Sequence, residues 1–503
     1  MQPIDYTILI VYFLLLISVG VWAATRVRNS ADYFTAGGRL PWWLTGISHH
    51  VSGYSGAVFV AYAGVAYTHG FSLYVWWAGG VFISTVVAAY LIAPKWSRLR
   101  TRFKIQSPTE YLSVRYNLAT QQIMAWCGVI IKIFDVGAKW AAIAILLYVF
   151  TGIPILAGIL IAGSVSLIYG ILGGLLADVL NDFAQFIIQL IAGFTMFFLI
   201  LREIGDGLAG YFTMWDRLPE AHSRLFNPPY TIGFFAAILI IDFFSYSGGT
   251  WHLATRFISS QSGKQAKKAA LLSSFLYLLW PLVLFFPMFA APIFIKDLAD
   301  PTQSYALMAL KFLPTGLLGL VLASLFTNTL SMTSSDANTI SAVITRDILP
   351  NIFPKLKTSS PRIMLILARA STFLFTALTI IIAIYSDSFG GVFGLIITWF
   401  AALVGPISIP MILGLLPWFR KSNSSSAIIS IIGGVITFAI LKTMGDVSLA
   451  LEIVSPMLCS LVIYIFSGLI AGEKVPERVD KLLEAIQHEN VMEVEAERNI
   501  TRK

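Results

Sequence analysis

Oxygen-bearing side chains are concentrated in two apolar segments of the chain, residues 178–185 and 328–338. In the first segment, Asp182 stands beside Asn181 and Gln185. In the second, four side chains recur at three- and four-residue spacing and therefore share one helix face. These are Ser331, Ser334, Ser335 and Asn338. A carboxylate with hydroxyls forms a hard, oxygen-rich site of net charge −1, which suits a monovalent alkali cation. No thiolate or imidazole metal site is indicated.

A further set of ionisable residues lies in the apolar segment 121–149. Lys132, Asp135 and Lys139 are spaced i, i+3 and i+7, so all three can fall on one helix face. Charges inside an apolar span are costly and need partners. Two lysines with one aspartate leave a surplus positive charge, which favours an anionic ligand or a titrating lysine. Asp242 and Asp336 are alternative sources of the missing negative charge.

Histidines and aromatic residues accompany these charges. The histidines favour hydrogen-bonded packing over proton relay; they are His49, His50 and His252. Four aromatic residues are of the kind that stacks on a sugar ring or gates access to it. They are Trp76, Trp77, Tyr246 and Tyr277.

The elements that position these residues are apolar helices. The chain contains about 13 apolar stretches of about 20 residues, the length that crosses a bilayer. Hydrophobic residues make up 57% of the sequence and charged residues only 12%, and the mean hydropathy is +0.79. A soluble protein with this composition would lack the polar residues to cover its surface. The sequence therefore predicts an all-α polytopic membrane protein with about 13 transmembrane helices.

Basic residues recur in alternate loops, and this asymmetry predicts the orientation. The intervening loops are neutral or acidic. Basic residues therefore mark cytoplasmic loops, and they account for the net charge of +8 without nucleic-acid binding. They include Arg26, Arg28, Arg39, Lys95, Arg98, Arg100, Arg256, Lys264, Lys267, Arg346, Lys355 and Arg420. Asp5 precedes the first apolar run and arginines follow it, so we expect the N-terminus outside and the C-terminus in the cytoplasm of the cell (inner) membrane.

Two of the expected spans are interrupted by glycine and small hydroxyl residues. The interruptions are at 48–56, within the second span (42–68), and at 242–250, within the seventh (231–255). Such residues at mid-membrane depth permit unwinding, and freed carbonyls can then bind ions or substrate. Because the interruptions are five spans apart, spans 2–6 and 7–11 are expected to be inverted repeats. The alternative is that these residues only allow close helix packing.

The expected organisation has six parts. They are residues 1–41 (first transmembrane helix and cytoplasmic loop), 42–203 (inverted repeat 1), 204–230 (extracellular loop), 231–418 (inverted repeat 2), 419–472 (two C-terminal transmembrane helices) and 473–503 (charged cytoplasmic tail). Apolar residues in the tail predict a short amphipathic helix. They are Val479, Leu482, Leu483 and Ile486.

Several segments resemble the sodium:solute symporter family. They are GGLLADVLNDFAQ (173–185), the segment 319–349 with its TSSDAN and TRDIL sequences, the segment 42–70, and SPTEYLSVRYN (107–117). The resemblance covers about residues 5–470. It implies the five-plus-five inverted-repeat core of the leucine transporter, sodium coupling and alternating access.

The resemblance also implies ion-binding residues. The family's common sodium site would use backbone carbonyls of Val51, Tyr54 and Asn328 with the hydroxyl of Ser331. Its second hydroxyl falls on Met332, which cannot supply one. A second sodium site of some members matches four residues of this chain, namely Asp182, Ser331, Ser334 and Ser335, so this cluster is the better-supported ion site.

The substrate positions implied by the resemblance mostly lack the polar side chains that a sugar needs. They fall near Ser55, Val58, Trp77, Phe243, Tyr277 and Thr398. Tyr246 stands at the position of the inner gating tyrosine of sugar-transporting members. Asp135 replaces the substrate-binding arginine of the sialic-acid members, which argues against an anionic substrate bound in that way. Asp242, in the second interruption, completes the candidate substrate-binding or gating residues.

The leading hypothesis is sodium-coupled symport of a small polar solute, a sugar or sugar derivative before an amino acid or carboxylate. A proton-coupled or uncoupled carrier of the same fold is the alternative, and a membrane sensor or enzyme is a remote one. Because no nucleophile–base constellation, phosphate loop or metal motif is present, we expect no enzyme. Sodium is the expected coupling ion, with no cofactor. The expected partners are the solute, sodium and membrane lipid, with no nucleic acid and no obligatory protein partner.

Overall fold

The structure is a computed structural model that describes residues 2–389, 391–395, 401–445, 447–470 and 474–488. Helices dominate this part of the chain, and it contains no β-strand. Ten helical segments within it are long and apolar enough to cross a membrane, which agrees with the predicted all-α membrane fold; the number 13 stays a prediction. They are Pro3–Ala24, Tyr74–Leu91, Leu118–Thr151, Gly174–Ile204, Ile232–Gly249, Gly263–Phe294, Leu317–Ile352, Pro361–Ile384, Ser424–Met444 and Ala450–Ile470.

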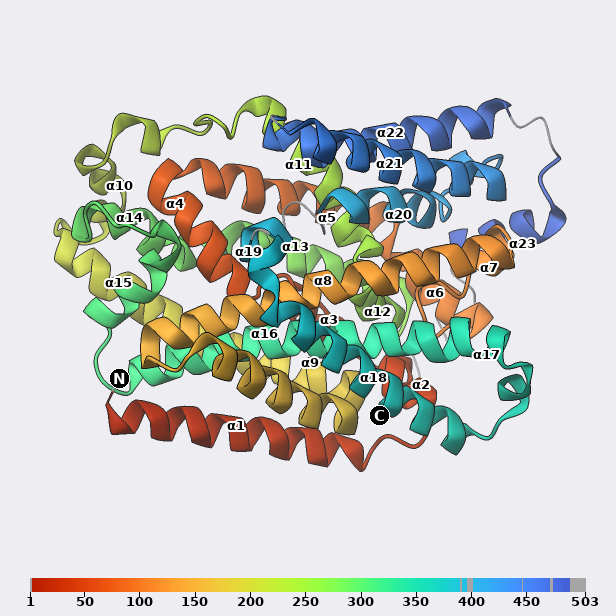
Figure 1. The fold of residues 1–503 in the computed structure, drawn as a ribbon, viewed down its shortest axis with the longest axis horizontal. Coiled ribbons are helices and arrows are strands. Elements are labelled where there is room, and N and C mark those ends of the chain that lie inside the picture. Colours follow the sequence, from red (N-terminus) through yellow and green to blue (C-terminus); the bar gives the residue numbers. More distant parts are fainter. Residues whose placement is uncertain (1, 390, 396–400, 446, 471–473, 489–503) are drawn as a thin grey trace.

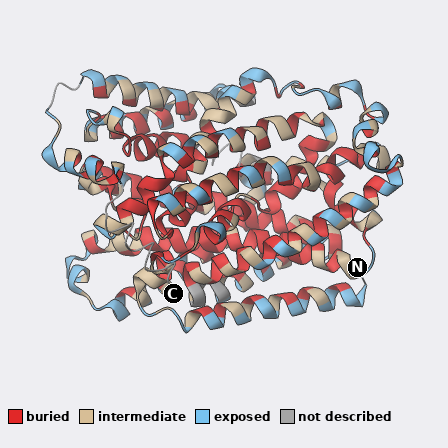
Figure 2. Ribbon diagram, turned by 180° about the vertical axis from the view of Figure 1, so that it is seen from behind, coloured by how far each residue is buried: buried red, intermediate tan, exposed pale blue. Residues whose placement is uncertain are grey.

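The helices lie side by side along the long axis of the molecule and are joined at its two ends (Figure 1). Buried residues fill the interior, and exposed residues follow the outer faces of the peripheral helices (Figure 2). Many of the exposed residues are large and apolar, as lipid contact requires. Examples are Leu14 on α1 (Pro3–Ala24), Leu374 on α18 (Pro361–Ile384) and Phe466 on α22 (Leu449–Ile470).

Both interruptions expected from the sequence are confirmed. The first lies between α3 (Trp42–Val51) and α4 (Ala63–His69), where the chain leaves helical structure at residues 52–55. The second lies between α11 (Ile232–Phe244) and α12 (His252–Ile258). There Gly248 adopts a φ of +115°, which glycine tolerates because it lacks a Cβ atom, and Trp251 has a φ of +67°. The non-glycine outlier at Trp251 marks backbone strain held by its surroundings.

A third break divides α9 (Ile155–Ile204) at Gly174, whose φ/ψ of 56°/−152° is not helical. A Cβ atom at this position would lie 2.5 Å from the carbonyl oxygen of Tyr33, so only glycine fits. The sequence predicts separate spans at 154–177 and 179–202, so a break is expected here, and the structure places it at Gly174. The break sets the direction of the second arm of α9, which carries Asp178 and Asp182.

The first helix of each expected repeat packs on the next long helix of the other repeat. α3 packs on α13 (Gly263–Leu284), α11 packs on α5 (Gly80–Leu91), and α5 and α13 pack on each other. α16 (Leu317–Ala342) lies among α1, α8 (Leu118–Thr151), α9 and α18, so it is buried on nearly all sides. The polar stripe of α16 is therefore enclosed by protein rather than by lipid.

The two ends of the molecule differ in their connecting helices. α6 (Ala93–Phe103), α7 (Leu112–Arg115), α17 (Leu349–Ile352) and α23 (Glu477–Gln487) gather at one end, and α10 (Gly210–Thr213) and α15 (Ser304–Phe312) lie at the other (Figure 1). α23 is the helix expected in the tail, of which residues 474–488 are described. Its four apolar residues are buried. Arg98 Nη1 donates to the carbonyls of Ile486 (3.0 Å) and Gln487 (2.8 Å), at the helix end where the backbone dipole favours a cation.

Candidate functional site

A buried cluster of carboxylates and hydroxyls lies where the second arm of α9 meets α16. Asp178 and Asp182 are four residues apart and therefore point to the same side of α9. Ser331 of α16 and Ser48 of α3 donate hydrogen bonds to Asp182. Both carboxylates are at most 1% exposed. The broken helix α3 thus reaches the same carboxylate as the enclosed helix α16.

The remaining serines of the α16 face bind the second carboxylate. Ser334 donates to Asp178 Oδ1, and Ser335 Oγ lies 3.2 Å from Asp178 Oδ2. The structure therefore brings together the predicted set of Asp182, Ser331, Ser334 and Ser335, but around two acids rather than one. The sequence analysis missed Asp178, although its i, i+4 spacing from Asp182 on one helix face was an available signal.

Arg256 is the second residue of the cluster that the sequence analysis misjudged. The positive-inside pattern placed it in a cytoplasmic loop, whereas it is fully buried within α12. Its Nη2 lies 3.3 Å from Asp182 Oδ2, 3.2 Å from Ser52 Oγ and 2.5 Å from Ser335 Oγ. With both carboxylates ionised and the guanidinium charged, the formal charge of these three residues is −1. Such a site lacks one monovalent cation for neutrality.

The residues of the other candidate sodium site lie next to this cluster. The carbonyl of Val51, at the end of α3, accepts the N–H of Tyr54 at 3.0 Å. Asn328 of α16 accepts a hydrogen bond from Gln185 of α9 through its side-chain oxygen. Met332 lines the central cavity described below.

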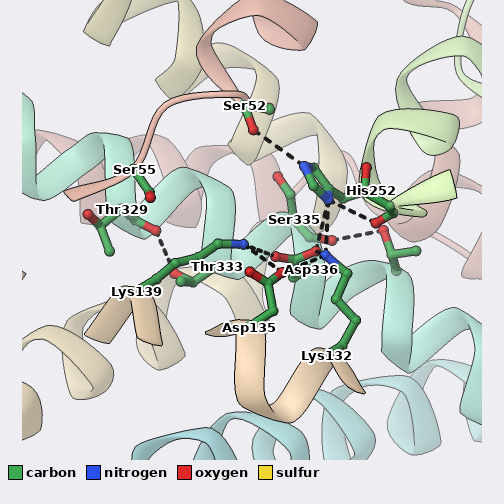
Figure 3. Close-up of polar contacts among 12 residues, drawn as sticks. Ser52, Ser55, Lys132, Asp135, Lys139, His252, Thr329, Thr333, Ser335 and Asp336 are labelled. Carbon is green, nitrogen blue, oxygen red and sulfur yellow. Dashed lines mark hydrogen bonds and ion pairs between the residues drawn. The ribbon is translucent and has the colours of Figure 1, made fainter. Parts of the chain in front are cut away.

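The charges of α8 form a closed network with α16 (Figure 3). Lys132 Nζ lies 2.7 Å from both Asp135 Oδ2 and Asp336 Oδ1. Lys139 Nζ lies 2.9 Å from Asp135 Oδ2 and 2.7 Å from Asp336 Oδ2. His252 Nδ1 is 2.9 Å from Asp336 Oδ1. Asp336, and not Asp242, supplies the negative charge that the sequence left open, so two lysines and two aspartates balance.

A central cavity of about 170 Å³ lies between the two interruptions, α8 and the π-helical segment Tyr74–Gly79 that precedes α5. Five of the candidate substrate-binding or gating residues line it, namely Ser55, Trp77, Asp135, Asp242 and Tyr246. Tyr277 is fully buried beside it, and its hydroxyl donates to the carbonyls of His49 (3.1 Å) and His50 (2.9 Å). Thr398 lies outside the described residues.

The histidines are packed among aromatic rings. The His49 ring stacks on Phe257 with centroids 4.8 Å apart, and its Nδ1 lies 2.7 Å from Ser273 Oγ. The His50 ring contacts those of Tyr54 and Tyr277 at 5.0 and 4.6 Å. These contacts support hydrogen-bonded packing for His49. Both ring nitrogens of His50 are buried without a hydrogen-bond partner among the described residues, so only its aromatic contacts agree with the expected role.

Two broken helices, a buried cation-type cluster beside them and a cavity between them define a secondary membrane transporter. Comparison with known proteins narrows this class. The model of the sodium:solute symporter family matches residues 33–434, and the chain belongs to this family. It is a multi-pass, sodium-coupled solute symporter with a leucine-transporter-like fold, and not an enzyme.

Individual relatives are distant but similar over their length. The sodium/glucose cotransporter of Vibrio parahaemolyticus is 25% identical, covering 93% of this chain and 90% of that protein. The sodium/sialic acid symporter NanT of Aliivibrio fischeri is 22% identical, covering 95% and 96%. The structure of a substrate-bound, outward-open Na⁺-coupled sialic acid symporter aligns with a TM-score of 0.81 at 20% identity, covering 93% of this chain and 98% of that one.

Proposed function

We propose that the protein couples sodium to the transport of a small polar solute, a sugar or sugar derivative, and that the coupling ion binds at the Asp178–Asp182 cluster. The observation that carries this assignment is the burial of two carboxylates beside one guanidinium, surrounded by serine hydroxyls. Oxygen ligands with a net charge of −1 match a single alkali cation. The residues proposed to bind it are Asp182, Ser331, Ser334 and Ser335, with Asp178 added.

The cluster is placed to couple ion binding to movement. Ser48 of α3 and Arg256 of α12 come from the two broken helices, whereas Asp178, Asp182 and the serines belong to α9 and α16. Sodium bound between the carboxylates weakens the attraction of Arg256 to Asp182, because the two cations repel. Ion binding therefore shifts the balance between arrangements of the broken helices relative to α9 and α16, which is the population shift that alternating access needs.

The repeat organisation and orientation are part of this proposal. The inverted repeats 42–203 and 231–418 are supported by the reciprocal packing of α3 on α13 and of α11 on α5. The orientation, with the N-terminus outside and the C-terminus in the cytoplasm of the inner membrane, is supported by the location of α6, α17 and α23 at one end of the molecule (Figure 1). The other parts of the chain, 1–41, 204–230, 419–472 and 473–503, are proposed to have the roles expected from the sequence. Membrane lipid is proposed to surround the helices, with no obligatory protein partner.

The other candidate sites are part of the proposal. Val51, Tyr54, Asn328 and Ser331 are proposed as a second, weaker sodium site that lacks a hydroxyl at Met332. The solute is proposed to contact the central cavity and its neighbours. These residues are Ser55, Trp77, Asp135, Asp242, Tyr246, Tyr277 and Thr398.

Thermal unfolding of the purified protein tests the ion assignment without a known solute. Sodium is titrated against potassium at constant ionic strength. An ion at about 100 times its dissociation constant stabilises the folded state by about 2.7 kcal/mol. We expect a saturable, sodium-specific rise in Tm that Asp182→Asn abolishes and that Asp216→Asn, at an exposed acid in the 204–230 loop, leaves intact. An unchanged sodium response in Asp182→Asn overturns the assignment.

A further inference from the structure

Asp242 of α11 is a buried carboxylate without a compensating group. It is 7% exposed and lines the central cavity, yet no hydrogen bond or ion pair to its carboxylate is present among the described residues. Its Oδ2 faces Gly80 of α5, where a Cβ atom would stand 2.7 Å away. An unpaired carboxylate in such a place is costly unless a ligand of complementary charge meets it.

The other charges of the cavity are already balanced. Asp135 and Lys139 also line it, but both belong to the closed network with Lys132 and Asp336. His252 is held within 2.9 Å of Asp336. Among the described residues that line the cavity, Asp242 is therefore the acidic side chain without a charge partner, and it is negative when ionised.

Aromatic side chains form much of the cavity wall near this carboxylate. Tyr62, Trp76, Trp77 and Tyr246 all line the cavity. The Tyr62 ring lies edge-on to both tryptophans, with centroids 5.5 Å from Trp76 and 5.6 Å from Trp77. Aromatic rings attract organic cations through their negative faces, and the attraction is strongest where water is excluded. Alkali ions instead prefer dense sets of oxygen ligands, such as the carboxylates and serines of the Asp178–Asp182 cluster.

We propose that the transported solute carries a positively charged amino group, which Asp242 and the aromatic wall bind, while the polar remainder of the solute meets Ser55 and Asp135. This inference rests on the proposed function and specifies its solute. A protonated amino sugar has this chemistry, and choline presents the same kind of cationic group beside a hydroxyl and serves as a probe of it. A neutral hexose would leave Asp242 uncompensated.

Pairs of ligands that differ in charge but not in size test the proposal on the unmodified protein. Choline is compared with 3,3-dimethylbutan-1-ol, its neutral carbon isostere, and D-glucosamine at pH 6.5 is compared with D-glucose. Each is titrated in saturating sodium, with potassium balancing ionic strength, and Tm is recorded. We expect a saturable rise in Tm with at least one of the two cations and none with its neutral partner. A response to the neutral partner alone, equal responses, or no response to either cation overturns the proposal.

A variant then locates the bound charge. Asp242→Asn is expected to weaken binding of the stabilising cation at least tenfold while retaining the sodium-dependent rise in Tm. Asp216→Asn, which removes an exposed acid, is the matched control and keeps both responses. Binding that is unchanged in Asp242→Asn overturns the assignment of this residue. The two proposals can fail separately. If the unmodified protein shows no sodium-dependent rise in Tm, the sodium assignment is contradicted. If it shows that rise but binds neither organic cation, only this inference is contradicted.

Discussion

Arg256 Nη2 lies 3.3 Å from Asp182 Oδ2, which joins the short arm of one broken helix to the long second arm of α9. Both side chains are fully buried. The same guanidinium nitrogen contacts Ser52, in the interruption of the other broken helix, and Ser335 of α16. One arginine therefore links the two broken helices to α9, which carries both carboxylates, and to α16, which carries the serines. The guanidinium also partly neutralises the carboxylates that sodium is proposed to neutralise.

Removal of this arginine should increase sodium affinity while destabilising the sodium-free protein. Arg256→Gln leaves two buried carboxylates without their cation, and breaking a buried pair costs about 3–5 kcal/mol. We expect a lower Tm in potassium, a larger rise in sodium, and a half-maximal sodium concentration reduced at least threefold.

Two comparison variants interpret that result. Arg256→Lys keeps the charge but not the planar donor group, so its sodium titration should stay closer to that of the unmodified protein. Arg362→Gln removes an exposed arginine at the start of α18 and should change neither value. A half-maximal sodium concentration that is unaffected in Arg256→Gln would contradict competition between the guanidinium and the ion.

The closed network of α8 and α16 should behave as a coupled unit. Lys132→Met leaves an excess of negative charge and Asp336→Asn an excess of positive charge, so each should destabilise the protein by about 3–5 kcal/mol. The double variant retains the balanced pair of Lys139 and Asp135. The loss of stability of the double variant, measured by thermal or denaturant unfolding, should be smaller than the sum of the losses of the two single variants. Additive losses would show that the four charges do not compensate one another.

Substitutions at Met332 test whether the second candidate sodium site binds an ion. Met332→Ser supplies the hydroxyl that the common site of the family uses and this chain lacks. We expect the sodium titration to gain a second saturable component or a steeper slope. Met332→Ala removes the same side chain without adding an oxygen, so it controls for the lost packing. Identical titrations for the serine and alanine variants would argue against a second ion at Val51, Tyr54 and Asn328.

The helical periodicity of α16 was sufficient to place Ser331, Ser334 and Ser335 on one face, because that relation is local. The interruptions in α3–α4 and α11–α12 were likewise predictable, since glycines clustered with hydroxyl residues permit a helix to unwind at mid-membrane depth. The acid that neutralises Lys132 and Lys139 was not predictable. Asp242 and Asp336 fit the charge count equally well, and only the tertiary packing of α16 against α8 distinguishes them.

Arg256 shows a different limit of sequence reasoning. Counting basic residues between apolar stretches assigns each to a loop, and near a helix end this cannot separate a solvent-exposed arginine from a buried one. The partners of Arg256 are Asp182 and Ser335, which are 74 and 79 positions away in the chain. Asp178, by contrast, was predictable from the sequence, because it lies one turn before Asp182 on the same helix face.

The docking of α23 predicts that the tail can be released without loss of the ion site. Leu483 is 3% exposed on the apolar face of this helix, and replacing a buried leucine by alanine typically costs about 2–5 kcal/mol. Because α23 is a terminal helix that packs on α6 and α7, Leu483→Ala should undock it locally rather than unfold the protein. Limited proteolysis of the tail should accelerate at least threefold, while the sodium-dependent rise in Tm stays the same.

Lys481→Ala, at a residue on the exposed face that pairs with Glu477, is the matched control and should be cleaved at the original rate. A tail that resists proteolysis equally in Leu483→Ala would mean that the contacts of Arg98 with the carbonyls of Ile486 and Gln487 hold the helix without its apolar face.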